Sequence, residues 1–254
     1  MSAGRALLFD VGNTRIKWGL AVDGELRRTG SLSHARLAEQ GPGALTSRLP
    51  ADVDSVTACN VAGASFATRL SALIGLHCER DVHYVRSAAR GWGVTSSYRQ
   101  PRRMGVDRWV AMIAARHAAK GPLCVVDAGT AVTIDALDGD GRHLGGQILP
   151  GLRLMMAALY TDTSDLPEVR RAPAGDAADG FASSTGSAIW HGALAAVCGA
   201  IERAVRKLGG RGRRPKLVLT GGDASRILAA IDVPADHRPN LVLEGLAVIV
   251  QNPS

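Results

Sequence analysis

One short pattern occurs twice in the sequence, and its residue types suit phosphate and cation binding. Residues 7–14 read Leu-Leu-Phe-Asp-Val-Gly-Asn-Thr, and residues 123–130 read Leu-Cys-Val-Val-Asp-Ala-Gly-Thr. In each copy an apolar run, typical of a buried parallel strand, leads to an aspartate, a spacer, a glycine and small polar residues. A carboxylate at a strand end can hold a cation directly or through water. The glycine lets backbone N–H groups approach an anion, and Asn or Thr side chains add donors.

The repetition of this pattern matters more than either copy alone. A single Asp-x-Gly junction is common, and two ordinary strand-to-turn junctions are one interpretation. Two copies in one chain, each on an expected strand, favour a pair of turns that grip a Mg-nucleotide from both sides. A third candidate is Thr220-Gly221-Gly222-Asp223, which follows another expected strand and offers N–H groups to the adenosine end of the nucleotide.

The stretch from Tyr98 to Arg108 combines a carboxylate with positive charge at the mouth of an expected helix. Asp107 and Arg108 follow Gly105 directly. One interpretation is structural, because an aspartate in the first turn of a helix is favoured by the helix dipole. The other is chemical, with Asp107 as a general base and Arg108 as a clamp for an anion. The residues themselves leave both interpretations open.

The elements that must position these residues follow from apolar periodicity and turn signals. Strands are expected at 7–10, 16–22, 25–31, 55–60, 82–86, 123–127, 131–137, 143–149, 217–220 and 240–243. Helices are expected at 35–49, 64–74, 106–119, 152–160, 185–208 and 224–231, with a short helix at the C-terminal end. Residues 91–105 and 161–184 are expected to be irregular.

The order of these elements indicates a duplication. Each half runs from a strand through an Asp turn into hairpin strands, and then into helix and strand units. This predicts an α/β protein with two related subdomains, residues 1–119 and 120–254, whose two Asp turns face one another across a cleft. Lys120-Gly121-Pro122 marks the boundary, and the last helix is free to pack back on the first subdomain.

Bulk composition narrows the functional classes. The 254 residues are 46% hydrophobic and 21% charged, as in a soluble globular protein. No apolar run of membrane-spanning length and no signal segment is expected, which predicts a cytoplasmic protein. The four cysteines form no C-x-x-C pair, so buried free thiols in a reducing compartment are expected. The net charge of +7 favours anionic partners, although the basic run 203–216 is better interpreted as a solvated helix end and loop.

Taken in order along nearly the whole chain, the motifs resemble those of the type III pantothenate kinases. These enzymes belong to the superfamily of sugar kinases, acetate kinase, heat-shock chaperones and actin. The matching motifs are 10–14, 105–108, 127–131, Gly145-Gly146-Gln147-Ile148-Leu149-Pro150-Gly151, Leu166-Pro167, Thr185, 220–222 and 243–245. Met104 and Ser184 depart from the common pattern, where Leu and Asn are frequent, and neither departure removes a charge.

The resemblance implies a fold and an activity. The fold would be two duplicated ribonuclease H-like (actin-like ATPase) subdomains with a central nucleotide cleft. The activity would be ATP-dependent phosphorylation of the hydroxyl of pantothenate to 4'-phosphopantothenate, the first step towards coenzyme A.

The resemblance also assigns nucleotide and metal residues. The cradle for the ATP phosphates would comprise Asp10, Val11, Gly12, Asn13, Thr14, Arg15, Ile16 and Lys17. Asp10 would hold Mg²⁺ through water, and Thr130 would contact phosphate from the other subdomain. Asp127 would bind a monovalent cation, K⁺ or NH₄⁺. Lys17 has an equal alternative as a solvated strand lysine.

The acceptor site implied by the resemblance spans two subunits. Pantothenate would be held by Tyr98 and by Gly105, Val106, Asp107 and Arg108. Arg108 would bind its carboxylate, and Asp107 would accept the hydroxyl proton. Thr185 would complete the site from the neighbouring subunit of a homodimer.

A rival hypothesis is a nucleotide-binding regulatory or nucleic-acid-associated accessory factor. The positive net charge and the basic run 203–216 support it. No helix-turn-helix, zinc or aromatic-basic RNA signature accompanies them in the sequence, so nucleic acid is an unlikely partner.

Overall fold

The computed structural model describes residues 4–173, 181–210 and 214–252. The chain divides into two compact units, and the first is discontinuous in sequence. This first unit contains the chain up to residue 120, residues 140–143 and the chain from residue 240 onward. The second unit contains residues 121–139 and 144–239.

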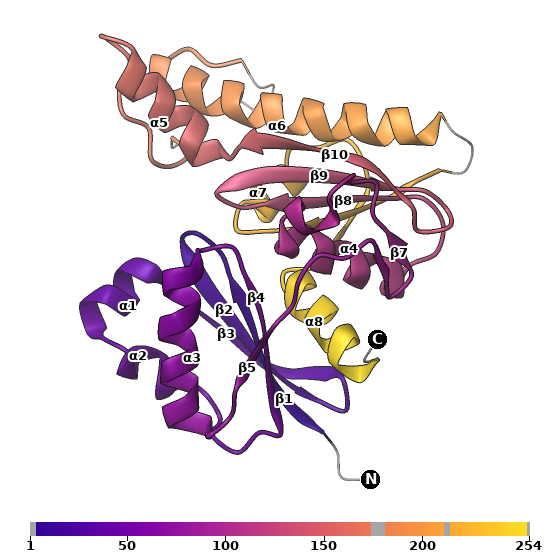
Figure 1. Ribbon diagram of the computed structural model, residues 1–254. Helices are drawn as coiled ribbons and strands as arrows, with labels where there is room; N and C mark the ends of the chain where they lie inside the picture. The colour runs from indigo at the N-terminus through magenta and orange to yellow at the C-terminus, as the bar shows by residue number, and fades with distance from the viewer. Residues whose placement is uncertain (1–3, 174–180, 211–213, 253–254) are drawn as a thin grey trace. The chain divides into compact units, whose positions relative to one another are not determined.

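The first unit is built on a five-stranded mixed sheet (Figure 1). Its strands are β1 (Arg5–Val11), β2 (Arg15–Val22), β3 (Glu25–Ser33), β4 (Ser55–Asn60) and β5 (Val82–Tyr84), in the order β3-β2-β1-β4-β5. The β1–β2 and β2–β3 pairs are antiparallel, whereas β4 is parallel to both β1 and β5. The carboxyl ends of β1, β4 and β5 therefore lie at one edge of this sheet.

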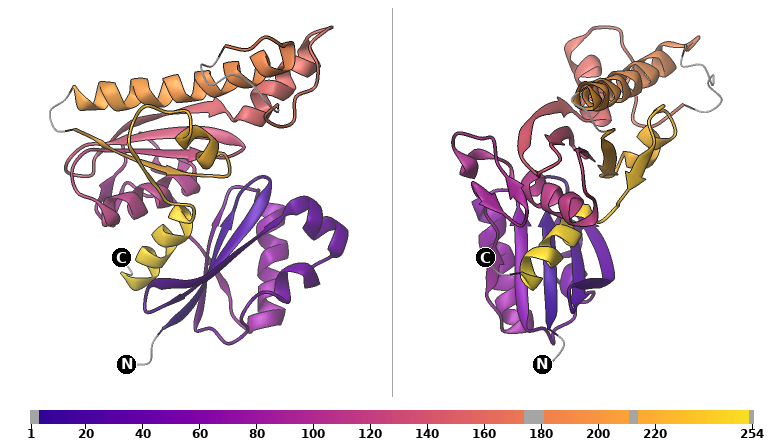
Figure 2. Two further views of the ribbon diagram at one scale, coloured as in Figure 1. Left: turned by 180° about the vertical axis from the view of Figure 1, so that it is seen from behind. Right: turned by 90° about the vertical axis from the view of Figure 1, so that its right-hand side faces the viewer.

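The two faces of the first sheet are covered by different helices. Leu7, Phe9 and Val11 alternate along β1 and belong to one core with residues of α2 (Gly43–Thr46) and α3 (Ala64–Cys78). Figure 1 and the reverse view in Figure 2 show α1 (His34–Gln40), α2 and α3 on one side of the sheet and α8 (Leu241–Gln251) on the other. Because side chains alternate along a strand, Asp10 points to the α8 side.

Helix α8 corrects one prediction. Residues 240–243 were expected to form a strand, but Leu241 begins a helix of eleven residues. A short apolar run fits a buried strand or a buried helix equally well. Here α8 packs against α4 (Val106–Ala118) as well as the sheet. Gly245 permits this contact, since a Cβ at that position would overlap the Val110 carbonyl oxygen.

The segment before α4 is more ordered than expected. A two-stranded ribbon, β6 (Arg90–Gly91) and β7 (Val94–Thr95), is followed by a 3₁₀ turn at Pro101–Arg103. The Thr95 N–H donates to the Gly141 carbonyl oxygen at 3.0 Å. The ribbon is therefore fixed to the turn that precedes β10, a contact between segments far apart in the sequence.

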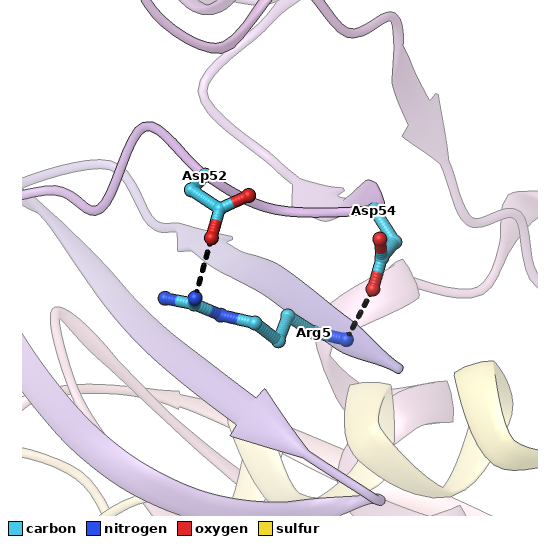
Figure 3. A network of polar contacts seen from close by, with 3 residues as sticks. All are labelled: Arg5, Asp52 and Asp54. Atoms are coloured by element: carbon cyan, nitrogen blue, oxygen red, sulfur yellow. Dashed lines mark hydrogen bonds and ion pairs between the residues drawn. The ribbon is translucent and has the colours of Figure 1, made fainter. Parts of the chain in front are cut away.

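The start of β1 is fixed by a polar network (Figure 3). The Arg5 backbone N–H donates to the Asp54 carboxylate at 2.7 Å, and the Arg5 guanidinium contacts Asp52 at 2.6 Å. The Asp54 N–H returns a bond to the Arg5 carbonyl oxygen at 2.8 Å. These exposed charges contribute little energy, but the bonds set the register in which β1 and β4 begin.

The second unit repeats the plan of the first and confirms the predicted duplication. Its strands are β8 (Leu123–Ala128), β9 (Ala131–Leu137), β10 (His143–Pro150), β11 (Lys216–Thr220) and β12 (Ala235–His237), in the order β10-β9-β8-β11-β12. As in the first sheet, the central strand pairs antiparallel with the strand that follows it and parallel with the fourth strand. The short strand β12 was not expected from the sequence.

The helices of the second unit share one core with its sheet. They are α5 (Leu152–Asp162), α6 (Thr185–Gly209) and α7 (Ala224–Leu228). By length and composition α6 could cross a membrane, which corrects the expectation that no apolar run reaches that length. Its buried residues Trp190, Val197 and Ile201 pack in the core of the unit.

Three further predictions need correction. The helix expected at 35–49 is two helices, α1 and α2, because Gly41 has a φ of +75° and Pro42 follows it. Helix α7 ends at Leu228 rather than at residue 231. Within the expected irregular segment 161–184, α5 continues to Asp162, residues 163–173 and 181–184 form no helix or strand, and residues 174–180 lie outside the described residues.

The cysteines confirm one prediction. Cys59, Cys78, Cys124 and Cys198 are all buried free thiols. Burial raises the pKa of Cys124 to about 12 and that of Cys198 to about 11. At neutral pH both are protonated, uncharged side chains that fill the core.

Candidate functional site

The first Asp motif forms a tight hairpin between β1 and β2. Asp10 lies directly opposite Lys17, so both side chains are on the same face of the sheet. The Gly12 N–H closes the turn by donating to the Arg15 carbonyl oxygen at 3.1 Å, and Asn13 and Thr14 are exposed. Exposed polar side chains and turn N–H groups at a strand end can receive an anion.

Two residues of the predicted cradle cannot act through their side chains. Val11 and Ile16 are fully buried in the core of the first unit. They hold the turn by packing and by pairing across the hairpin. Only their backbone groups are left for a ligand, whereas Arg15 is exposed and Lys17 is half-buried.

His34 supports this turn, and no sequence pattern singles it out. Its Nε2 lies 2.7 Å from the Gly12 carbonyl oxygen, and its backbone N–H donates to the Thr14 carbonyl oxygen at 3.0 Å. A carbonyl oxygen only accepts, so Nε2 carries a proton and donates. The His34 and Phe66 rings also make an edge-to-face contact, with centres 4.7 Å apart and planes inclined by 79°. His34 therefore fixes both ends of the exposed turn.

The start of α4 lies at the same edge of the first sheet as this turn. The Val61 N–H, just after β4, donates to the Val11 carbonyl oxygen at 2.9 Å. Asn60 and Val61 line a cavity of about 600 Å³ together with Gly105 and Val106, which begin α4. Of the predicted acceptor residues, Gly105 and Val106 therefore lie close to the first Asp turn within one unit, whereas Tyr98, Asp107 and Arg108 are not in the cavity lining.

The chemistry of this cavity suits an anionic molecule. Arg86 and Arg102, both exposed, contribute to its lining, and the lining residues include no Asp or Glu. Ser87 donates from Oγ to the Met104 carbonyl oxygen at 2.9 Å, and the Tyr84 hydroxyl donates to the Ala67 carbonyl oxygen at 2.8 Å. These polar groups are satisfied within the protein, which leaves the two guanidinium groups as the main attraction for a ligand.

Asp107 lies in the first turn of α4 and is half-buried. Its Oδ1 accepts a hydrogen bond from the Arg108 N–H at 2.8 Å. A negative charge in the first turn of a helix is also favoured by the helix dipole, which is the structural role of Asp107. A carboxylate has two oxygens and several lone pairs, so the bond is compatible with a chemical role as well.

Arg108 and Tyr98 form a second cluster in the first unit. The side chain of Arg108 is buried, with 6% of the residue exposed, and its Nη1 donates to the Tyr98 hydroxyl at 2.9 Å. The guanidinium carbon lies 5.7 Å from the centre of the Tyr98 ring. The structure therefore brings together two residues that the resemblance assigns to the same acceptor.

The second Asp motif adopts the corresponding position in the second unit. Asp127 pairs with Thr133 of β9 and with Thr220 of β11. The Gly129 N–H donates to the Ala131 carbonyl oxygen at 3.0 Å and closes the turn, in which Thr130 is half-buried. This turn is the structural counterpart of the one between β1 and β2.

Two other predicted motifs converge on this second turn. The Gly151 N–H donates to the Thr130 carbonyl oxygen at 3.0 Å. Gly221, with a φ of +101°, lies against the backbone of Ala128, and the Asp223 N–H donates to the Ala128 carbonyl oxygen at 3.0 Å. The edge of the second sheet therefore gathers three glycine-containing turns, a type of backbone that can approach a phosphate or nucleotide closely.

Thr185 is the first residue of α6, and it is exposed. Ser184 caps this helix, because its Oγ accepts from the Ser187 N–H at 3.3 Å. Thr185 also lines a mainly apolar groove of about 720 Å³ between α5 and α6. The groove belongs wholly to the second unit.

The donor set fits a magnesium ion held partly by its ligand. Among the described residues, no group of three or more His, Cys, Asp or Glu side chains could hold a metal. Mg²⁺ in phosphate-transfer sites is bound by one or two carboxylates, water and the substrate phosphates. Asp10, a carboxylate beside an exposed turn, matches that requirement.

The sequence matches one protein family over most of its length. The model of the type III pantothenate kinase family matches residues 6–207. A type III pantothenate kinase of Burkholderia thailandensis is 41% identical over 265 residues, covering 98% of this chain and 99% of its own. One of Thiobacillus denitrificans is 37% identical over 249 residues, covering 96% of each chain.

Solved structures share the fold at lower identity. A Campylobacter jejuni protein described as a Baf family transcriptional activator has a TM-score of 0.62 and 22% identity, with 97% of this chain and 98% of that chain covered. A Sinorhizobium meliloti protein described as a 2-dehydro-3-deoxygalactonokinase has a TM-score of 0.60 and 18% identity, with coverages of 98% and 100%. At these identities the likeness concerns the fold alone.

Proposed function

Because the chain belongs to the type III pantothenate kinase family, we infer that it transfers the terminal phosphoryl group of ATP to the hydroxyl of pantothenate. This reaction is the first step of coenzyme A biosynthesis. The observation that best supports it is the shared edge of the first sheet, where the β1–β2 turn and the cavity beside Gly105 adjoin. A phosphate cradle and an acceptor pocket at one edge are what phosphoryl transfer requires.

Positioning and charge neutralisation dominate phosphoryl transfer, since its transition state is loose. We propose that residues 10–17 of the first unit hold the ATP phosphates and that Thr130 of the second unit also contacts them. Gly221 and Gly222 would lie along the adenosine end. The exposed residues Asn13, Thr14 and Arg15 of the β1–β2 turn support the first assignment.

The cations of the reaction are assigned to the two motif aspartates. Asp10 would hold Mg²⁺ through water, and Asp127 would bind K⁺ or NH₄⁺. A divalent ion bound with the nucleotide would neutralise phosphate charge. The role of the protein is to present each carboxylate at a rigid strand end, which β1 and β8 provide.

Pantothenate would occupy the cavity beside Gly105 and Val106, with its carboxylate near Arg108 and Tyr98. Asp107 would orient the hydroxyl and accept its proton. The exposed guanidinium groups of Arg86 and Arg102 in the cavity lining support a carboxylate-bearing acceptor. Thr185 would complete the site from a neighbouring subunit.

A homodimer is supported by apolar residues that are exposed on the second unit. Ile148 on β10, and Leu159 and Tyr160 on α5, are 64%, 39% and 50% exposed. Leu159 and Thr185 both line the groove between α5 and α6. Contact between two copies at this groove would cover the apolar residues and bring Thr185 to the interface.

We expect Leu159→Asp to convert the dimer into a monomer, because a buried carboxylate at the interface is costly. A loss of about 2 kcal/mol would weaken the dimer about thirtyfold. Sedimentation velocity across a dilution series measures the dissociation constant of the dimer. Leu76→Asp is the matched control, since Leu76 is 87% exposed on α3 and does not line the groove. A dimer equally strong in the Leu159 variant would disprove this interface.

A coupled assay for ADP release, with and without pantothenate, tests the function itself. We expect ADP release that depends on pantothenate. Release without pantothenate would indicate an ATPase instead. Salt-sensitive DNA binding without ADP release would indicate the accessory factor, which the kinase family membership does not favour. Because this is a biosynthetic reaction on soluble substrates, we propose that the protein acts in the cytoplasm.

A further inference from the structure

We propose that His143 is a positioning residue that holds Tyr98 in place for acceptor binding. The inference rests on the proposed function, in which Tyr98 and Arg108 bind the carboxylate end of pantothenate. No motif discussed above includes His143, and it contacts Tyr98 only because the chain folds back over 45 residues. Both residues belong to the first unit.

His143 is almost completely buried, with 1% of the residue exposed. Its ring stacks on the Tyr98 ring, with centres 6.0 Å apart and planes inclined by 26°. Its Nδ1 lies 3.1 Å from the Ser97 Oγ. One side chain therefore makes an aromatic contact with Tyr98 and a hydrogen bond to the residue before it.

Tyr98 needs such support because its own segment has no helix or strand. Its backbone N–H donates to the Ser96 Oγ at 3.2 Å, and the Ser96 N–H donates to the Ala89 carbonyl oxygen at 2.9 Å. The backbone of the loop is thus fixed up to residue 96. Beyond that point, Arg108 holds the Tyr98 hydroxyl, and His143 supports the Tyr98 ring and the backbone neighbour Ser97.

The direction of the Tyr98 ring determines what Arg108 can do. The Tyr98 hydroxyl accepts the Arg108 Nη1–H at 2.9 Å, which turns the guanidinium in one direction. If Tyr98 rotates away, the buried guanidinium loses a charge-assisted hydrogen bond and reorients. His143 therefore acts on the acceptor through Tyr98 and Arg108, without touching the acceptor itself.

Steady-state kinetics of two His143 variants test this inference. His143→Asn keeps a polar group near Ser97 and removes the stacked ring, whereas His143→Phe keeps the ring and removes the hydrogen bond. We expect His143→Asn to raise the KM for pantothenate about tenfold and His143→Phe to raise it less, as for other residues that orient a binding group. The KM for ATP should stay within about twofold of wild type in both, because the β1–β2 turn does not depend on Tyr98.

A double-mutant cycle separates positioning from simple packing. In a Tyr98→Ala background, His143→Asn should raise the pantothenate KM no further, since the group it positions is gone. His117→Asn, an exposed histidine on α4, is the matched control and should leave both KM values unchanged. Thermal melting of each variant reports folding independently.

Three outcomes would overturn the inference: an unchanged pantothenate KM in His143→Asn, an equal rise in both KM values, or additive effects in the Tyr98→Ala background. Each is distinct from failure of the proposed function. That failure would appear in the wild-type protein as ADP release that does not respond to pantothenate.

Discussion

Replacing Asp107 with asparagine is expected to lower kcat by about a thousandfold while leaving ATP affinity within about twofold. The variant lacks the base that orients the attacking hydroxyl, and we therefore expect the rate of the chemical step to fall. Asparagine is the right substitution because its Oδ1 can still accept the Arg108 N–H that the Asp107 Oδ1 accepts at 2.8 Å. The start of α4 should therefore stay intact, and the lower kcat should reflect the chemical step rather than a change in folding.

The measurement is ADP release at saturating ATP and pantothenate, with nucleotide affinity measured separately by calorimetry. Asp81→Asn, at an exposed aspartate before β5, is a control that removes the same charge away from the cavity. A kcat near that of wild type in Asp107→Asn would leave Asp107 with only the structural role at the helix start. Equal loss in the Asp81 variant would point to a general effect of charge.

Gly221→Ala is expected to destabilise the second unit by about 3 kcal/mol, because two penalties coincide. Gly221 has a φ of +101°, where residues with a Cβ are strained, and the added Cβ would overlap backbone atoms of Ala128. The backbone of Ala128 cannot move aside in the way that the end of a flexible side chain can. The overlap would also push Ala128 away from the Asp223 N–H that bonds to it at 3.0 Å.

Gly222→Ala supplies a stringent control for this prediction. No atom lies within 4 Å of a Cβ built on Gly222, and its φ is not in the left-handed region. Its free energy of unfolding in urea should stay within about 0.5 kcal/mol of wild type. Equal destabilisation by the two variants, or none in Gly221→Ala, would contradict the geometric argument. Activity of the Gly222 variant would then report the nucleotide role of this turn separately from folding.

The sequence predicts the repeated framework well because each half carries the same local signals. The Asp turns, the two strands at 131–137 and 143–149 and the long helices α4 and α6 follow from period and turn chemistry within short windows. The Gly-Pro pair at 41–42 could also have indicated two helices, since it combines a residue suited to positive φ with one that ends a helix. Patterns within a short window are enough to predict an element whose conformation is determined by its own residues.

Long-range contacts explain what could not be predicted. Residues 240–243 form a helix because the run continues through Gly245, which fits against Val110 over a hundred residues away. His34 and His143 lie outside every motif, and each gains its role from a partner fixed by the fold. A single histidine forms no sequence pattern with a distant residue, so its partner can be identified only from the structure.

The discontinuity of the first unit has a consequence for how the protein is made. Residues 241–251 are translated after the whole of the second unit, yet α8 covers one face of the sheet formed by the first 84 residues. A nascent chain at the ribosome must therefore carry that sheet with an uncovered apolar face while the second unit is synthesised. Chaperone binding and protease sensitivity during synthesis should concentrate on this face, and a stop codon just before residue 241 would make the exposure permanent.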